Sequence, residues 1–343
     1  MKEIDVISPS KSNYDAIDLL KFICCLLIIV IHSQFYLPWM KPYVRIAVPI
    51  FFVVSSFFFF KKNPDISNLK VYIKRLLFLY LFWFIFWLPF YSYSHRDDLF
   101  QISPLNGVVF FFQSFFFGST FEASWYIMAS IIGTLIVFLW GRIFNNLVLL
   151  LLGCLIYIIA VLGTTYHDLF CTFGLLNDWF REYTGTNMTV SFPVSIIYIC
   201  IGKYLSDIFY QQNFGSKRNM LLIIIFFSIL GLQLEYQFVE PYFLCDDSFF
   251  FLIPVSVCIV LLALSLQVSI PKAKVLRKIS TIVYCSHYSL IFLCSMVSFV
   301  FLDITELTPF SKFLVALFGS LFLCFIILAL ESKKYFKWLK FSY

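Results

Sequence analysis

The feature that most constrains this chain is a succession of apolar runs, each about as long as a membrane-crossing helix. A helix that crosses the hydrocarbon core of a bilayer needs about 20 predominantly apolar residues. The sequence predicts an all-α integral membrane protein with about ten transmembrane helices, near residues 16–37, 44–60, 71–91, 122–141, 146–164, 189–209, 219–238, 248–266, 281–302 and 310–330.

Composition supports a membrane protein over a soluble one. Hydrophobic residues make up 61% of the 343 residues and charged residues only 13%, whereas soluble domains carry roughly twice that charged fraction. The more polar windows, 91–107 and 164–187, are no longer than loops, so we expect residues 1–343 to form one membrane domain. The apolar segment 105–118 is too short to span and is predicted to be re-entrant or interfacial.

The distribution of Lys and Arg predicts the orientation of the helices. With the N-terminus placed inside and ten spans, 19 of the 25 Lys and Arg residues fall on the inner side. Five fall outside, namely Lys41, Arg45, Arg96, Arg181 and Lys312, and Lys21 lies within the first span. Since positive residues favour the cytoplasmic side, we expect both termini in the cytoplasm. We also expect no cleavable signal peptide, because the first apolar run is too long for one.

Several other classes of site are not indicated. Most of the ten cysteines lie inside apolar runs, and no C-x-x-C motif or His/Cys cluster has metal-ligand spacing. We therefore expect no metal, no permanently bound cofactor and no nucleic-acid partner. Cys171 and Cys245 are both predicted in outer loops, and a disulfide between them is one alternative.

The first span carries an unusual polar stripe. Asp18, Lys21 and His32 all lie within its apolar run, where ionisable groups are costly and commonly mark function. Eleven residues separate Lys21 from His32, which returns the helix to within about 20° of the same face with a rise of roughly 16 Å. Asp18 lies one turn from Lys21 and is predicted to pair with it. The alternatives are a snorkelling ion pair at the inner headgroups and an interfacial histidine.

A second intramembrane histidine, His287, lies in the ninth predicted span. Its distance from the basic inner flank places it between Lys21 and His32 in depth, roughly 12 Å from the level of His32. We therefore expect no direct contact between the two histidines, but a polar path lined by all three residues. The alternative is a buried histidine bonded to a neighbouring helix.

Other candidate residues have competing structural explanations. Ser55 in the second span is suited to close helix packing, and Glu122 and Trp125 begin the fourth span, where Trp is commonly an interface anchor. Asn187 opens the sixth span and is explained equally well as its cap. His95 is most simply part of a solvated loop.

These patterns together resemble the acyltransferase-3 family of bacterial membrane proteins. The first span resembles the family's D-x-x-K/R signature followed by ten residues and His. The second resembles P-x-F-F-x-x-S-G-F, the segment SWYIMASI resembles the W-F/Y-L element, and ISTIVYCSHYSLI resembles S-x-x-x-Y-x-x-H. The matching residues are Asp18, Lys21, His32, Pro49, Phe51, Phe52, Ser55, Phe57, Trp125, Tyr126, Ser280, Tyr284 and His287.

The resemblance implies an O-acyltransferase that moves an acetyl or succinyl group from cytoplasmic acetyl-CoA or succinyl-CoA to a hydroxyl group. The acceptor would be a cell-envelope polysaccharide or a lipid-linked sugar, and the protein would reside in the bacterial cytoplasmic membrane. His32 would act as general base or transient nucleophile. Lys21, held by Asp18, would bind the donor, while Tyr284 and His287 would orient its carbonyl. Ser55, Trp125, Glu122 and Asn187 are the remaining substrate-binding candidates.

The sequence departs from the family pattern in two places. Ser56 stands where glycine is usual, and Thr186 stands where an arginine is common before Asn187. The role of that arginine would pass to another residue, such as Arg181, or be lost. Two other functions stay open: an exporter of an envelope precursor or acyl group, and a non-catalytic membrane scaffold. The missing internal repeat disfavours the exporter.

Overall fold

The computed structural model describes residues 14–343, apart from 102, 122, 210–213 and 304–305. Within this part of the chain all regular structure is helical and no strand occurs. The α-helices are α1 (Asp15–Ser33), α2 (Lys41–Val44), α3 (Ala47–Phe60), α4 (Ile66–Ser94), α5 (Pro104–Phe116), α6 (Trp125–Trp140), α7 (Asn146–Thr164), α8 (Cys171–Thr184), α9 (Phe192–Ile208), α10 (Arg218–Val239), α11 (Leu252–Ser265), α12 (Ala273–Leu302) and α13 (Pro309–Glu331). Short helical turns complete them: η1 (Pro38–Met40), η2 (Asp97–Gln101), η3 (Met188–Val190), η4 (Phe214–Lys217) and η5 (Lys334–Ser342).

The protein is a multi-pass, all-α membrane protein. In the described residues, seven helical segments are long and apolar enough to cross a bilayer. They are α1, Pro38–Phe60, α4, α7, α10, Ala273–Phe301 and α13. Each of the ten predicted spans coincides with a helix, but α6, α9 and α11 have only 14 to 17 residues. The short apolar segment predicted at 105–118 is the 13-residue helix α5.

The structure differs from the sequence prediction most in the polar windows. The window 164–187, which is predicted to be a loop, contains the amphipathic helix α8. Helix α12 begins eight residues before the predicted start at 281, so its first two turns contain basic residues that the apolar pattern did not include. Helix α4 likewise begins at Ile66, where the side chain of Asp65 accepts a hydrogen bond from the Asn68 amide and caps the helix.

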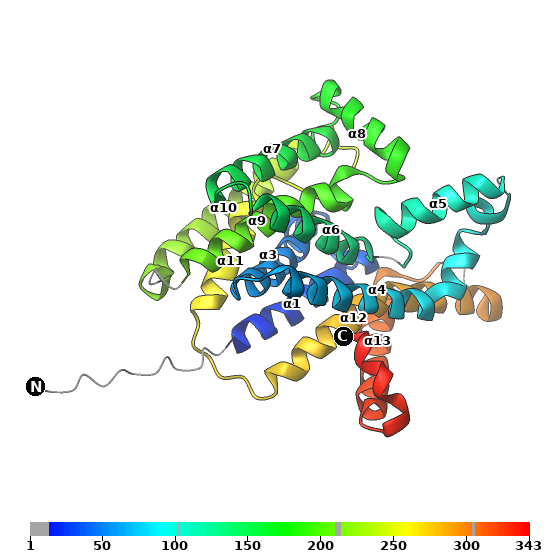
Figure 1. Ribbon diagram of the computed structural model, residues 1–343. Coiled ribbons are helices and arrows are strands. Elements are labelled where there is room, and N and C mark those ends of the chain that lie inside the picture. The colour runs from blue at the N-terminus through cyan, green and yellow to red at the C-terminus, as the bar shows by residue number, and fades with distance from the viewer. Residues whose placement is uncertain (1–13, 102, 122, 210–213, 304–305) are drawn as a thin grey trace, which may run out of the picture.

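Small residues bring the central helices α3, α6 and α9 together (Figure 1). A Cβ atom on Gly202 of α9 would lie 1.9 Å from Ser56 Oγ of α3, and one on Gly133 of α6 would lie 2.3 Å from Ser195 Oγ. Such close approach is how transmembrane helices gain packing contacts that lipid cannot provide. Ser56, the departure from the family pattern, therefore lies in a tight helix crossing.

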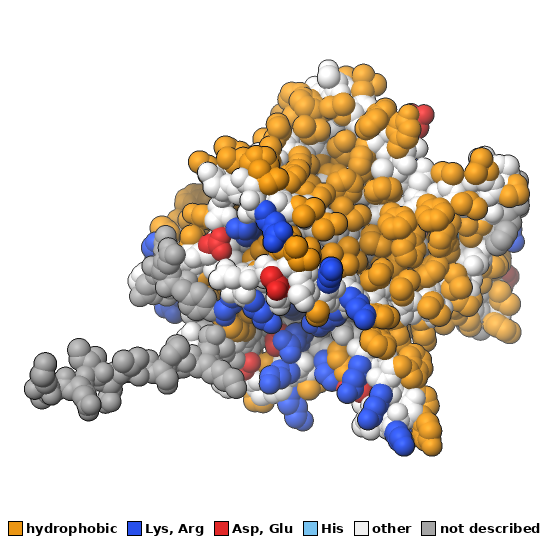
Figure 2. Space-filling view, viewed as in Figure 1, with side chains coloured by type: hydrophobic (Ala, Val, Ile, Leu, Met, Phe, Trp, Pro, Cys, Tyr) orange, Lys and Arg blue, Asp and Glu red, His pale blue; other side chains and the backbone are white. Residues whose placement is uncertain are grey.

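Helices α1, α12 and α13 form a second group on the lower side of the molecule in Figure 1. The carboxylate of Asp15 accepts a hydrogen bond from the Ile270 amide at 2.9 Å, which ties the start of α1 to the segment before α12. Figure 2 shows Lys and Arg side chains gathered on the side that holds the start of α12 and the C-terminal segment, while hydrophobic side chains cover most of the rest of this face.

Candidate functional site

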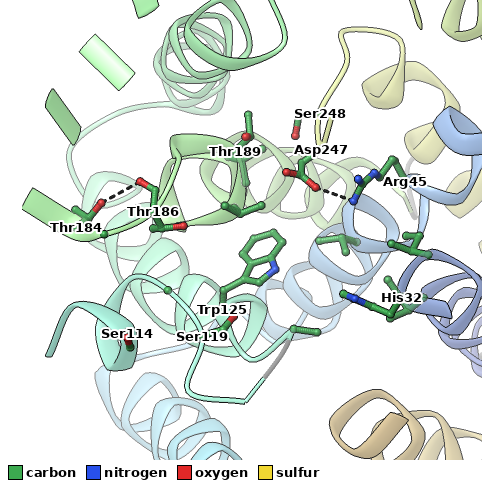
Figure 3. Close-up of a pocket in the computed structure, with 18 of the residues that line it drawn as sticks. His32, Arg45, Ser114, Ser119, Trp125, Thr184, Thr186, Thr189, Asp247 and Ser248 are labelled. Carbon is green, nitrogen blue, oxygen red and sulfur yellow. Dashed lines mark hydrogen bonds and ion pairs between the residues drawn. The ribbon is translucent and has the colours of Figure 1, made fainter. Parts of the chain in front are cut away.

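A cavity of about 530 Å³ lies among α1, α3, α6, α9 and α12. Its wall is completed by the loop before α11 and by the ends of α4, α5 and α8. In Figure 3, His32 and Arg45 lie on one side of the cavity, Thr184 and Thr186 lie on the opposite side, and Trp125 projects between them. The loop and helix-end residues belong to segments that the charge pattern predicts outside.

His32 lies in the last turn of α1 and lines this cavity. Its ring centroid is 5.0 Å from that of His287 and 5.2 Å from that of Tyr288. The prediction that the two histidines do not meet is therefore wrong. The predicted difference in depth does not hold because Arg277, at the basic start of α12, lies 3.9 Å from Asp18 of α1 and sets the two helices level at this pair. Counted from that pair, the two histidines differ by four residues, or about 6 Å of rise, which their side chains bridge.

His287 is fully buried behind His32. Its Nδ1 lies 2.8 Å from the Tyr284 carbonyl oxygen and 3.1 Å from that of Val283. Because carbonyl oxygens only accept, Nδ1 carries a proton, and in the neutral ring Nε2 then holds the lone pair. Nε2 is buried and has no hydrogen-bond partner among the described residues. The arrangement thus leaves a basic nitrogen, held in one tautomer, against the ring that faces the cavity.

An ion-pair cluster forms the cavity wall beside His32. Arg45 donates to Asp246 at 2.6 Å and approaches Asp247 at 2.6 Å, and Lys41 lies 2.5 Å from Asp246. Burial alone would raise the pKa of Asp246, but the charges of Arg45 and Lys41 outweigh it and lower that pKa below its ordinary value. Two cations and two carboxylates make the cluster neutral, yet Arg45 and Asp247 both face the cavity.

The loop that carries Asp246, Asp247 and Ser248 is tied to neighbouring helices. Glu235 of α10 is buried, and its carboxylate accepts from the amides of Phe250 and Phe251 at 2.7 and 2.9 Å and from the Tyr166 hydroxyl at 3.0 Å. The Thr165 hydroxyl donates to the carbonyl of Ser248. These bonds fix the loop without using its cavity-facing side chains.

Some of the predicted site residues do come together. Trp125 and Tyr284 line the cavity with His32, and the Tyr284 hydroxyl donates to the Ala123 carbonyl at 2.6 Å. Ser55 does not line it; its hydroxyl donates to the Phe51 carbonyl at 2.7 Å, one helical turn away.

Other predicted residues lie elsewhere. Asn187 does not line the cavity, and its side chain accepts a hydrogen bond from the Asn177 amide at 3.0 Å. Arg181 is exposed on α8 and does not line the cavity either. Glu122 falls outside the residues that the structure describes. Arg181 therefore does not replace the arginine that is common at position 186, whereas Thr186 itself lines the cavity.

Asp18 and Lys21 lie at the other end of α1, away from the cavity. The predicted pair between them is wrong: among the described residues, the ion pair of Asp18 is with Arg277 of α12. The sequence could not reveal this partner because helical spacing predicts contacts within one helix only. Lys21 is left without a carboxylate within 4 Å in the described part of the chain.

Sequence reasoning missed Arg45, Asp247 and His95. In the charge pattern Arg45 is one of five outer cations, and its place beside a membrane span is the signal that singles it out. His95, interpreted as part of a solvated loop, is half-buried and lines the cavity. It does so because α4 continues to Ser94 and delivers the histidine to the cavity rim.

The cysteines and the possible metal ligands bear on two of the sequence expectations. Cys171 and Cys245 are both free thiols, and Cys245 contacts Thr189 instead. Among the described residues, no group of three or more His, Cys, Asp or Glu side chains could hold a metal ion.

Comparison with known proteins adds one family and two relatives. The model of an acyltransferase domain matches residues 14–329. Two proteins of Enterococcus faecalis, each named amino-acid racemase, are 24% identical over 307 residues and 25% identical over 230 residues. The alignments cover 81% and 64% of this chain but only 41% and 31% of the relatives, so the chain spans less than half of their length. No solved structure matches.

Proposed function

On the premise that this chain belongs to the acyltransferase-3 family, we propose that it transfers an acetyl or succinyl group from acyl-CoA to a hydroxyl of a cell-envelope sugar. The observation that supports this best is His32, which faces a cavity of about 530 Å³ with the lone pair of His287 behind it. A cavity of this size is typical of small-molecule sites. The acceptor is a polysaccharide or a lipid-linked sugar.

The proposed topology has ten spans with both termini in the cytoplasm of a bacterium, in its cytoplasmic membrane. Basic side chains gathered on one side of the molecule support this orientation (Figure 2). With that orientation the cavity opens outward, and Lys21 lies near the cytoplasmic side. The acceptor sugar then enters from outside, whereas the donor approaches from the cytoplasm.

The proposed general base is His32. A sugar hydroxyl gives its proton to the imidazole while its oxygen bonds to the acyl carbon, and the thioester C–S bond breaks. The imidazolium then returns the proton to the departing thiolate of CoA. His287 supports this step as a neutral neighbour that accepts hydrogen bonds and does not repel the imidazolium. The guanidinium of Arg45 suits the negative charge that develops on the carbonyl oxygen.

The same cavity offers the groups that bind sugars. The indole of Trp125 supplies an aromatic face, and Asp247 supplies a carboxylate that can accept hydrogen bonds from hydroxyl groups. Lys21 supplies a cation for the donor, and Asp18 fixes the crossing of α1 and α12 through Arg277.

The test is mass analysis of envelope glycans from cells with and without the gene. A gain of one acetyl or one succinyl mass per repeat supports transfer and identifies the donor. Identical glycans in the two strains would reject it. Movement of a sugar across vesicles by the purified protein without acyl-CoA would instead favour an exporter.

A further inference from the structure

A second groove lies far from the cavity, between the first half of α4 and the C-terminal turn η5. It has a volume of about 350 Å³ and is lined mainly by three cations and three aromatic rings: Lys74, Arg75, Lys340, Phe78, Phe341 and Tyr343. We propose that this groove binds the nucleotide phosphates of the acyl-CoA donor. The inference rests on the proposed function, which requires a donor but assigns no site to its nucleotide.

The walls of the groove are held together before any ligand binds. The rings of Phe78 and Phe341 stack with centroids 5.0 Å apart and planes 25° apart. The indole of Trp83 donates to the Ser342 carbonyl at 3.0 Å, and Lys278 donates to the Tyr343 hydroxyl at 2.8 Å. These bonds dock η5 on α4 and α12, so little ordering would be needed on binding.

The three cations of the groove form no ion pair among the described residues. In the described part of the chain, Lys74, Arg75 and Lys340 are exposed and none has a carboxylate within 4 Å. By contrast, Lys278 is paired with Glu331 at 3.2 Å and Arg277 with Asp18 at 3.9 Å. Three cations around one groove suit an anion with more than one phosphate, although Lys340 also lies within electrostatic range of Glu331.

The aromatic rings narrow the choice to a nucleotide. Phe78, Phe341 and Tyr343 line the groove beside the cations, as aromatic rings do in sites that bind a flat base together with its phosphates. Phe78 and Phe341 already stack on each other, and Lys278 Nζ lies 4.3 Å from the centroid of the Tyr343 ring. The nucleotide of CoA carries three phosphates and an adenine. Arg75 also lies within electrostatic range of Lys21, which belongs to the helix that ends at His32. A donor anchored here can extend its pantetheine arm along α1.

The experiment uses the full chain in lipid nanodiscs and measures equilibrium binding of acetyl-CoA and of S-acetyl-pantetheine, which lacks the nucleotide. The variant is K74Q/R75Q/K340Q, and the matched control is K70Q/K337Q, which removes two exposed lysines outside the groove. We expect the triple variant to bind acetyl-CoA at least tenfold more weakly. Its affinity for S-acetyl-pantetheine and the behaviour of the control should match the unaltered protein.

Unchanged affinity of the triple variant for acetyl-CoA would overturn the inference. If that variant also lost co-purified anionic lipid, the groove would be a site for lipid headgroups instead. Because binding is measured without an acceptor, failure of sugar acylation alone would reject the proposed function and leave this inference standing.

Discussion

The rings of His32 and His287, carried by α1 and α12, have centroids 5.0 Å apart, and Nε2 of His287 is buried with no hydrogen-bond partner in the described part of the chain. Nδ1 of His287 donates to backbone carbonyls, which fixes its tautomer. Two imidazoles in contact, one of them facing a cavity, form a compact unit for proton transfer.

Replacing His32 by alanine should lower acyl transfer by roughly 10²- to 10⁴-fold, the contribution expected of a general base. Envelope glycan acylation and membrane protein level are the two measurements. His167→Ala is the matched control, because His167 lies outside the cavity. Normal acylation in the His32 variant would remove His32 from the mechanism.

Replacing His287 by glutamine should lower kcat by about tenfold while KM for the acceptor stays the same, because His287 touches His32 and does not line the cavity. Steady-state kinetics in nanodiscs measure both constants. A lower yield of folded protein with unchanged kcat would show that His287 serves packing alone.

Replacing Asp247 by asparagine should weaken acceptor binding by about tenfold and leave donor binding unchanged. The carboxylate faces the cavity and holds Arg45 at 2.6 Å, so its loss removes both an acceptor of hydrogen bonds and an ion pair. Asp178→Asn is the control on the exposed surface. Equal acceptor KM values in the two variants would contradict this role.

The ion pairs of Asp246 predict a pH dependence of stability. Its pKa in the folded protein lies below the ordinary value. The pair therefore contributes its full stability above the unfolded pKa, about 3.9, and loses it as pH falls through the folded pKa. Thermal unfolding between pH 7 and pH 3 should show a smaller decline for Asp246→Asn than for the unaltered protein. Parallel curves would exclude Asp246 as a source of acid sensitivity.

Replacing Gly202 by alanine should destabilise the protein by about 1–3 kcal/mol, the usual cost of overpacking, because its Cβ would lie 1.9 Å from Ser56 Oγ. Adding Ser56→Gly should recover part of the loss; the Val53 carbonyl at 2.6 Å prevents full recovery. Gly118→Ala, with its nearest atom at 3.5 Å, is the control. Thermal unfolding of the purified variants measures the effect.

The sequence by itself determined the membrane character, the succession of helices and the polar residues of α1, because apolar length and helical period are local properties. Only the tertiary structure decided that His32 meets His287, that Asp18 pairs with Arg277, and that Arg45 meets Asp247. Such contacts depend on the relative depth of the helices and on loops about 200 residues apart in the sequence that meet in the fold. The helical periodicity of a single segment contains no information about either. The cavity arises for the same reason, since five helices and three helix ends form it and none contains it alone.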